Sequence, residues 1–288
     1  MRPRVPEMPE PHSVHVLGVR FHNLTRSEAA RAIAALAMAD GKSYVVKPYS
    51  EFMPRAFRDT AVRDVLNAAQ LCLADGVGIL WAAHYLLLRG GPFRAIVQLP
   101  LSLASLALDS GALRGVLKEN MAGVDLTWEM LSRLEEAGAA VYLLGGREYE
   151  LRGARARIEE RLPELRIAGA RHGHFAPGGA ENEEVVAAIN AAAPQALLVA
   201  MGFPLQEQWI AANLPRLSVN VAVAEGGSFS FISGATRRAP LWMRRSGLEW
   251  LFRLLRQPSR LRRQLAIPAF IWLVVRERFG AGRAIPHG

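Results

Sequence analysis

Cysteine and long apolar runs are both scarce in this 288-residue sequence. Its only cysteine, Cys72, cannot form an internal disulfide, so a reducing compartment is the expected setting. The thiol lies in the apolar run LCLA, which favours a buried residue over a catalytic one. The apolar runs at 95–108 and 265–275 are shorter than the roughly 18 to 20 residues that a transmembrane helix needs. They predict core helices or segments lying in a membrane interface, and the arginines before the second run favour the interface.

Several functional signatures are also missing. The dinucleotide fingerprint Gly-x-Gly-x-x-Gly is absent, together with the acidic ribose contact that follows it, which argues against a nicotinamide-dependent enzyme. His172 and His174, in the run HGHF, are expected on one face of a strand, but no third ligand accompanies them and no metal site is predicted. Residues 1–13 are rich in proline and have no apolar run, so we interpret them as a flexible lead-in rather than a secretory signal.

Positive charge is concentrated at one end of the chain. The formal charge is +9 in total, yet from Arg237 onward twelve arginines face only Glu249 and Glu277, which gives this segment a charge of +10. Such a segment suits the phosphates of nucleic acid, an anionic membrane or a small phosphorylated substrate. The aromatic residues among the arginines belong to no recognisable nucleic-acid module, and the nearly neutral remainder offers no basic groove. Both points argue against nucleic acid.

Short apolar, β-branched segments alternate with helical patterns along most of the chain. Strands are expected near residues 43–47, 71–74, 139–146, 166–170, 196–202 and 220–227, and helical patterns fill 148–162 and 180–193. This alternation predicts an α/β fold, a Rossmann-like and mostly parallel sheet with helices on both faces. We place this domain at 14–236, with an insertion at about 86–118 that carries Pro100. A helical, basic appendage follows at 237–288, divided by Pro258.

Four of the expected strands end in polar or glycine-rich motifs. In chain order these motifs hold Asp75, then Gly145 and Gly146, then Gly202, Gln206 and Glu207, and finally Gly226 and Gly227. Ligands of parallel sheets bind beyond the carboxyl ends of the strands, so the four motifs predict a single polar crevice. Its glycines would let backbone amides approach a phosphate.

The order and spacing of the motifs indicate a family. DGVG, GVDL, LLGG, HGHF, GFPxQExW, GGSFxFxSG, RRAP, GLEWLxRL and PSRLRR together resemble the WecG/TagA/CpsF glycosyltransferases over residues 43–272. Members of that family move a hexose, often an N-acetylated mannose derivative, from a UDP-sugar to a polyprenyl-diphosphate-linked sugar. They do so with inversion and without a required metal. The resemblance implies an enzyme of bacterial surface-polysaccharide or teichoic-acid synthesis with no cofactor, bound peripherally to an anionic membrane at its cytoplasmic face. It leaves open whether the chain forms a homo-oligomer.

The resemblance also implies roles for particular residues. Asp75 would be the general base that deprotonates the acceptor hydroxyl, and Gln206 would line the donor pocket beside the five glycines of the strand-end motifs. In the appendage Arg253, Arg260 and Arg263 match family arginines that bind the diphosphate and close over the active site. The remaining residues implied in the sugar pocket are Lys47, Tyr49, Asp125 and Glu207.

Some positions depart from the family pattern. Lys47-Pro48-Tyr49 replaces a common Thr-x-Asn, Leu205 replaces a lysine, and Ser230 replaces an aspartate. These departures lie around the presumed sugar-binding edge, so the sequence leaves open whether the hexose is of the N-acetylmannosamine type, a glucose or a uronic acid, and which sugar accepts it. It also leaves open an alternative function, in which a degenerate transferase scaffold binds anionic lipid or nucleic acid through its basic segment.

Overall fold

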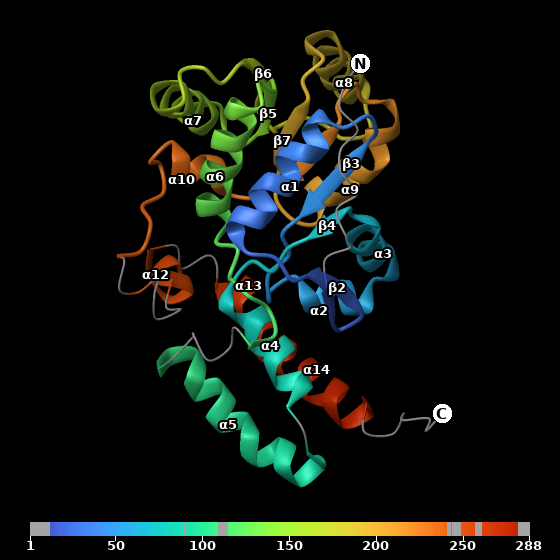
Figure 1. Ribbon diagram of the computed structural model, residues 1–288, viewed down its shortest axis with the longest axis vertical. Helices are drawn as coiled ribbons and strands as arrows, with labels where there is room; N and C mark the ends of the chain where they lie inside the picture. Colours follow the sequence, from blue (N-terminus) through green and yellow to red (C-terminus); the bar gives the residue numbers. More distant parts are fainter. Residues whose placement is uncertain are drawn as a thin grey trace.

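The structure is a computed structural model that describes residues 12–88, 90–108, 115–240, 243, 249–256 and 261–281. Its centre is a six-stranded parallel sheet in the order β4-β3-β8-β7-β5-β6, and a two-stranded antiparallel ribbon, β1-β2, lies beside it (Figure 1). The strands are β1 (Ser13–Val16), β2 (Val19–His22), β3 (Ser43–Val46), β4 (Leu71–Cys72), β5 (Val141–Gly145), β6 (Ile167–Arg171), β7 (Ala196–Ala200) and β8 (Val221–Ala224).

Helices separate the strands and follow the last of them. They are α1 (Arg26–Met38), α2 (Met53–Arg58), α3 (Thr60–Ala68), α4 (Val77–Leu87), α5 (Pro92–Leu108), α6 (Gly123–Glu136), α7 (Glu148–Arg161), α8 (Ala180–Ala192), α9 (Leu205–Asn213), α10 (Ser228–Ile232), α12 (Glu249–Arg256), α13 (Leu261–Gln264) and α14 (Ala266–Ala281). A short 3₁₀ turn, Leu214–Arg216, follows α9. No strand follows β8 in the described part of the chain.

Both faces of the large sheet are buried, and alternate strand residues explain why. In β8, Val221 and Val223 join the cluster formed by α1, α6, α7 and α10, whereas Ala222 and Ala224 join the opposite cluster with α3, α8 and α9. Successive side chains of a strand point to opposite faces, so a strand that is apolar at every position must be covered on both sides. The expectation of a mostly parallel sheet with helices on both faces is therefore confirmed, and each of the six expected strands forms.

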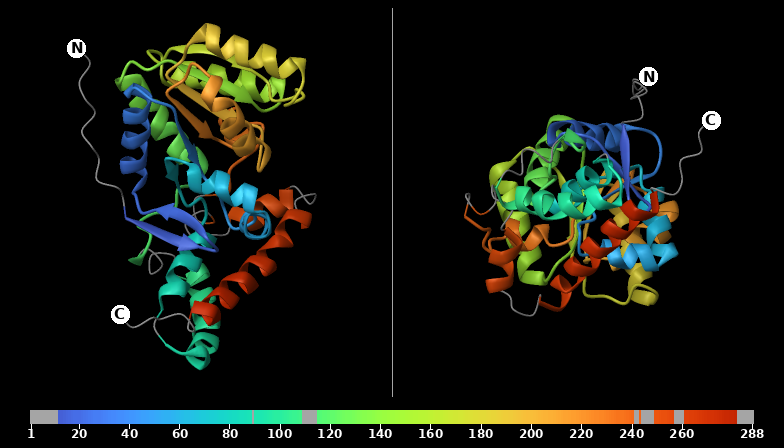
Figure 2. Two further views of the ribbon diagram at one scale, coloured as in Figure 1. Left: turned by 90° about the vertical axis from the view of Figure 1, so that its right-hand side faces the viewer. Right: turned by 90° about the horizontal axis from the view of Figure 1, so that it is seen from below.

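Three helices extend away from the sheet, and one of them belongs to the expected insertion. Figures 1 and 2 show α4, α5 and the far end of α14 beyond the sheet layer, with α5 the most distant. The Tyr85 hydroxyl in α4 donates to the Ala95 carbonyl at 2.9 Å, and Trp81 Nε1 donates to Ser102 Oγ at 3.0 Å. These bonds hold α5 on α4. None of the helices in the described residues has the length and apolar character needed to cross a membrane.

Two features of the fold differ from what the sequence suggests. The β1-β2 ribbon was not expected, because its strands are only four residues each. The placement of His172 and His174 on a strand is wrong, since β6 ends at Arg171 and both histidines lie in the following loop. Pro258 and its neighbours at 257–260 lie outside the described residues, and the domain boundary near 237 stays a prediction.

Gly145 provides a test of how tightly the strand ends pack. Its φ is +127°, and a Cβ at this position would lie under 3.0 Å from backbone atoms of Ala200 in the neighbouring strand β7. Gly145→Ala should therefore lower the free energy of unfolding by roughly 2 to 4 kcal/mol, measured by urea denaturation. Gly178→Ala is the control, because no atom lies within 4 Å of its Cβ position, and its effect should stay within about 1 kcal/mol. Equal stability of both variants would contradict the close approach of β5 and β7.

Candidate functional site

A cavity of about 960 Å³ lies at the carboxyl ends of the parallel strands. This volume falls at the upper end of the range of about 300 to 1,000 Å³ that is usual for small-molecule and cofactor sites. All six strands contribute to its wall through the residues that follow them, namely Lys47 after β3, Asp75 after β4, Gly146 after β5, His174 after β6, Met201 after β7 and Glu225 after β8. The four strand ends expected at one crevice do meet there, and the exits of β3 and β6 complete the wall.

Asp75 lies in the cavity wall between β4 and α4. The Gly76 amide that follows it donates to Asn120 Oδ1 at 2.6 Å, which fixes the turn. Asp75 Oδ2 lies against Gly123, the first residue of α6, since a Cβ on that glycine would be 3.3 Å from the oxygen. The amino end of a helix carries partial positive charge, so a carboxylate at this point is stabilised as an anion. The Asp75 side chain therefore lies between the start of α6 and the space of the cavity.

A buried ion pair connects two neighbouring strand exits at the cavity wall. Lys47 Nζ lies 2.9 Å from Glu225 Oε2, with only 4% and 0% of the two side chains exposed. The contact is an ion pair rather than a well-aligned hydrogen bond. The Thr127 hydroxyl of α6 lies 2.5 Å from the same carboxylate oxygen and 2.7 Å from the Gly123 carbonyl. Because a lone buried charge is strongly unfavourable, each member of the pair requires the other. The pair joins the exits of β3 and β8, and Thr127 connects it to α6.

Gln206, the second residue of α9, joins two glycine loops. Its Oε1 accepts hydrogen bonds from the Gly202 amide at 3.1 Å and from the Gly226 amide at 3.0 Å. Its Nε2 donates to Glu207 Oε1 at 2.9 Å. Although Gln206 lines the cavity, its side-chain amide is engaged with the protein on both sides. Its observed contribution is to hold the exits of β7 and β8 in one position.

Glu207 is buried behind Gln206 and does not line the cavity. Burial raises the pKa of Glu207 to about 7, and the hydrogen bond from Gln206 offsets this only in part. Removal from water disfavours the charged form of a carboxyl, which is why the shift is upward. Glu207 Oε2 has no hydrogen-bond partner among the described residues.

An aromatic wall borders the cavity at the exits of β3 and β7. The Phe52 and Phe203 rings are stacked, with centroids 3.8 Å apart and an interplanar angle of 10°, and Tyr49 lies 3.8 Å from Phe52 at a tilt. All three residues line the cavity. Planar apolar surfaces of this kind suit the face of a ring in a ligand.

Arginines gather at the side of the cavity that adjoins α10 and α12. A smaller cavity of about 300 Å³ shares Glu150 and Ser230 with the large one and is lined by Arg147, Arg237 and Arg256. Ser230, which stands where the family commonly has aspartate, donates to Glu150 Oε1 at 2.6 Å. Three guanidinium groups around one small cavity form a site suited to a phosphate or another anion.

The expected site residues divide into three groups. The cavity is lined by Lys47, Tyr49, Asp75, Gly146, Gly202, Gln206, Gly226 and Gly227. Gly145, Asp125 and Glu207 do not line it. The side chains of Arg253 and Arg263, and the whole of Arg260, lie outside what the structure describes. The expectation that the glycine amides approach a phosphate is contradicted at three positions. The Gly146 N–H donates to the Ala200 carbonyl at 2.8 Å, and the Gly202 and Gly226 N–H groups donate to Gln206 Oε1.

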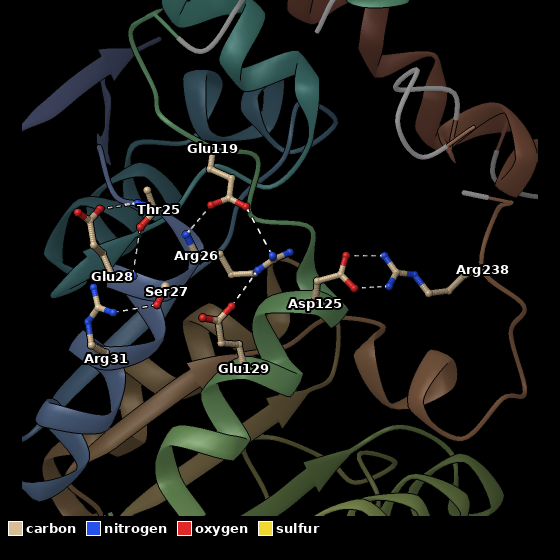
Figure 3. A network of polar contacts seen from close by, with 9 residues as sticks. All are labelled: Thr25, Arg26, Ser27, Glu28, Arg31, Glu119, Asp125, Glu129 and Arg238. Carbon is tan, nitrogen blue, oxygen red and sulfur yellow. Dashed lines mark hydrogen bonds and ion pairs between the residues drawn. The ribbon is translucent and has the colours of Figure 1, made fainter. Parts of the chain in front are cut away.

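Asp125 illustrates why a motif residue need not face a cavity. It lies in the first turn of α6, and both its oxygens accept from the Arg238 guanidinium, at 2.5 and 3.1 Å (Figure 3). The same helix is held to α1 by Arg26, whose Nε donates to Glu129 Oε2 at 2.9 Å. Asp125 thus attaches the segment after α10 to α6.

Sequence reasoning missed several residues of the cavity wall. They are Glu51, Phe52, Arg55, Arg147, Glu150 and Glu225. Arg147 directly follows the Gly145-Gly146 pair and Glu225 directly precedes Gly226, so position beside a strand-end motif was the available signal. Within the described ranges, no three His, Cys, Asp or Glu side chains are grouped as metal ligands.

Comparisons with known proteins agree with the resemblance. The family described as "Glycosyl transferase WecG/TagA/CpsF family" matches residues 14–107 and 103–284. The N-acetylglucosaminyldiphosphoundecaprenol N-acetyl-beta-D-mannosaminyltransferase of Staphylococcus aureus strain MW2 is 26% identical over 267 residues, covering 92% of this chain and 93% of the relative. The enzyme of the same name from Bacillus spizizenii is 28% identical over 245 residues, covering 85% and 82%.

The raised pKa of Glu207 predicts a pH-dependent stability. Below pH 4.5, the ordinary pKa, the carboxyl is protonated in both the folded and unfolded states. As the pH rises from 4.5 to about 7, only the unfolded chain loses the proton, so the free energy of unfolding falls. Above pH 7 the penalty is complete, at about 3 kcal/mol from this single group.

Glu207→Gln should remove this contribution, because a glutamine can still accept the bond from Gln206 and carries no charge. Urea unfolding at about pH 5 and at about pH 8 measures how much the free energy of unfolding changes between these two pH values. Exposed Glu164 provides the matched control, and Glu164→Gln should retain the pH dependence of the parent. If the stability of the parent and that of the Glu207→Gln variant depended on pH in the same way, the raised pKa of Glu207 would be refuted.

Proposed function

The chain belongs to the WecG/TagA/CpsF family of glycosyl transferases, and we propose that it transfers a hexose of the N-acetylmannosamine type from a UDP-sugar to a polyprenyl-diphosphate-linked sugar. The names of the similar S. aureus and B. spizizenii enzymes support this choice of sugar and acceptor, because both describe N-acetylmannosaminyl transfer to a diphosphoundecaprenol-linked N-acetylglucosamine. The product would enter a cell-surface polysaccharide or a teichoic-acid linkage.

The observation that carries the proposal is the position of Asp75. In an inverting transfer the carboxylate removes the proton from the acceptor hydroxyl while the hydroxyl oxygen attacks the anomeric carbon. The bond from that carbon to the UDP oxygen breaks on the opposite face, and UDP leaves with the bonding electrons. Positioned proton transfer of this kind typically contributes about 10² to 10⁴ in rate. The carboxylate at the β4 exit, beside the amino end of α6 and in the wall of the 960 Å³ cavity, supports this role.

Arginine side chains would stabilise the leaving diphosphate. Arg147, Arg237 and Arg256 line the smaller cavity next to the large one, where they can oppose negative charge that develops on UDP. Arg253, Arg260 and Arg263 remain predicted donor-side residues of the same appendage. The family resemblance implies that no metal is required. In this proposal the arginine side chains neutralise the negative charge of the diphosphate in place of a metal ion.

We place the reaction at the cytoplasmic face of the bacterial plasma membrane. A polyprenyl-linked acceptor is held in the bilayer, and the basic segment from Arg237 onward would be attracted to its anionic lipids by about 1 kcal/mol for each arginine near the surface. The buried and unpaired Cys72 is consistent with a reducing compartment.

Asp75→Asn tests the proposed base. Turnover should fall by about 10² to 10⁴ because the amide cannot take the proton, while the amide keeps the shape of the side chain and hence the melting temperature. The measurement is UDP release from UDP-N-acetylmannosamine in the presence of a diphosphate-linked N-acetylglucosamine acceptor. Asp64→Asn, on the exposed side of α3, should leave turnover unchanged. Normal turnover by the Asp75 variant would remove this residue as the base.

Charge removal at the smaller cavity tests the diphosphate role. In an Arg147→Gln and Arg256→Gln double variant the affinity for UDP, measured by calorimetry, should fall by roughly tenfold or more, since hydrogen bonds to charged groups contribute about 1.5 to 3 kcal/mol each. Arg152→Gln is the control, because Arg152 is exposed on α7 and lines neither cavity. Equal losses in all of these variants would indicate a general charge effect instead of a diphosphate site.

A further inference from the structure

Helix α5 presents a stripe of large apolar side chains to solvent. Phe93, Ile96, Val97 and Leu101 are 79%, 61%, 50% and 67% exposed. Their spacing of three or four residues puts them on one side of the helix. Leu87, at the end of α4, is exposed beside this segment. Singly exposed apolar residues are common, but a contiguous group of this kind marks a surface with a partner.

The opposite side of α5 is well packed, so the exposed stripe is not the result of a loosely attached helix. Ala95 and Ser102 are buried, and Leu99 and Leu103 pack against the main core. In addition to the bonds from α4, Arg278 of α14 donates to the Leu88 carbonyl at 3.1 Å and to Gln98 Oε1. The helix therefore carries apolar side chains on its packed side and also on the side where Phe93, Ile96, Val97 and Leu101 are exposed, and nothing in the described residues covers that second side.

The charge of α5 is compatible with an anionic lipid surface as the partner of its exposed side. The helix contains no acidic residue, and Arg94, which is exposed beside Phe93, is its only charged residue. Exposed apolar side chains with an adjacent arginine and no acidic group can enter the interface of an anionic bilayer without bringing negative charge to it. Seventeen residues of helix extend about 25 Å, enough to lie along a surface.

Exposed apolar side chains also occur on α14 and just before it, between α5 and the cavity. Trp272 and Leu265, in and just before α14, are exposed large apolar residues, and α14 contacts both α4 and α5. The first residue of α14, Ala266, lines the large cavity. Seen from below, α5 and α14 both lie at the near end of the molecule (Figure 2, right). An uncovered apolar surface thus adjoins the helix that begins at the cavity.

We infer that the exposed side of α5 inserts into the interface of an anionic lipid bilayer and holds the cavity next to a lipid-linked acceptor. The inference adds a second contact to the basic appendage, within the segment at 86–118 that sequence alone marked as an insertion. It rests on the proposed function for the identity of the acceptor, but the membrane contact itself can be measured without catalysis.

Vesicle flotation tests the contact directly. The full chain should float with vesicles of phosphatidylcholine and phosphatidylglycerol, and an Ile96→Asp and Leu101→Asp double variant should bind at least roughly tenfold more weakly. Met38→Asp is the matched control, because Met38 is an exposed large apolar residue on α1, far along the chain from α5. Flotation of the double variant equal to that of the parent, or no flotation of the parent, would overturn the inference.

A site-specific probe keeps the test valid if the double variant folds poorly. Ile96→Cys can be labelled selectively with an environment-sensitive fluorophore, since the natural thiol, Cys72, is buried and burial raises its pKa. Addition of the same vesicles should shift the emission of this label to the blue and leave a label at Met38→Cys unchanged. No shift at Ile96, or an equal shift at both positions, would contradict insertion of α5.

Two further measurements distinguish membrane insertion from dimerisation and separate the membrane contact from catalysis. If α5 joined two copies of the chain, the parent would be a dimer by light scattering, the double variant a monomer, and their flotation the same, and the inference would be wrong. Turnover of a water-soluble, short-chain diphosphate acceptor should be equal in parent and double variant. Loss of turnover in both proteins, with flotation as expected, would reject the proposed function and leave the membrane contact standing.

Discussion

The candidate site depends on one constraint, that six strands run in the same direction and end at the same edge of the sheet. Each strand therefore delivers the residues after it to a single cavity, although these residues are far apart in the sequence. Parallel strands are joined only through long crossovers, so the exits need additional contacts to stay in register with one another. Gln206 supplies such a contact between the loops after β7 and β8, and the Lys47–Glu225 pair supplies another between β3 and β8.

These contacts place polar and charged groups where water does not reach, which is costly unless they are paired. Lys47 and Glu225 solve this by neutralising one another, and the Thr127 hydroxyl donates a hydrogen bond to the Glu225 carboxylate. Glu207 solves it differently, because its raised pKa lets it take up a proton near neutral pH. Lys47 and Glu225 line the cavity and Glu207 lies behind its wall, so buried polar groups hold the strand exits in position both in the wall and beneath its surface. Asp75, the residue with the proposed chemical role, lies against the start of α6.

The sequence predicts the sheet well because each of its central strands is a short, almost continuous apolar run, as in ALLVA of β7. It also indicates the edge at which Asp75, Gln206 and Gly226 meet, since carboxyl ends of parallel strands coincide. It cannot reveal which partner a polar side chain chooses. Asp125 follows a recognisable motif yet bonds Arg238, more than a hundred residues away. Such choices depend on tertiary contacts that no local pattern records, and four-residue strands such as β1 carry too little pattern to detect.

Helix α14 has a consequence for the distances at which the enzyme works. Its first residue, Ala266, lies in the cavity wall, and Arg278, twelve residues later, bonds to the segment that carries α5. Twelve residues of α-helix measure about 18 Å, and a helix hardly changes its length. If α5 lies in the bilayer that holds the acceptor lipid, α14 sets a fixed distance between the membrane surface and the mouth of the cavity. The acceptor would then be selected by how far its diphosphate and first sugar project from the membrane, and the length of its lipid chain would not matter.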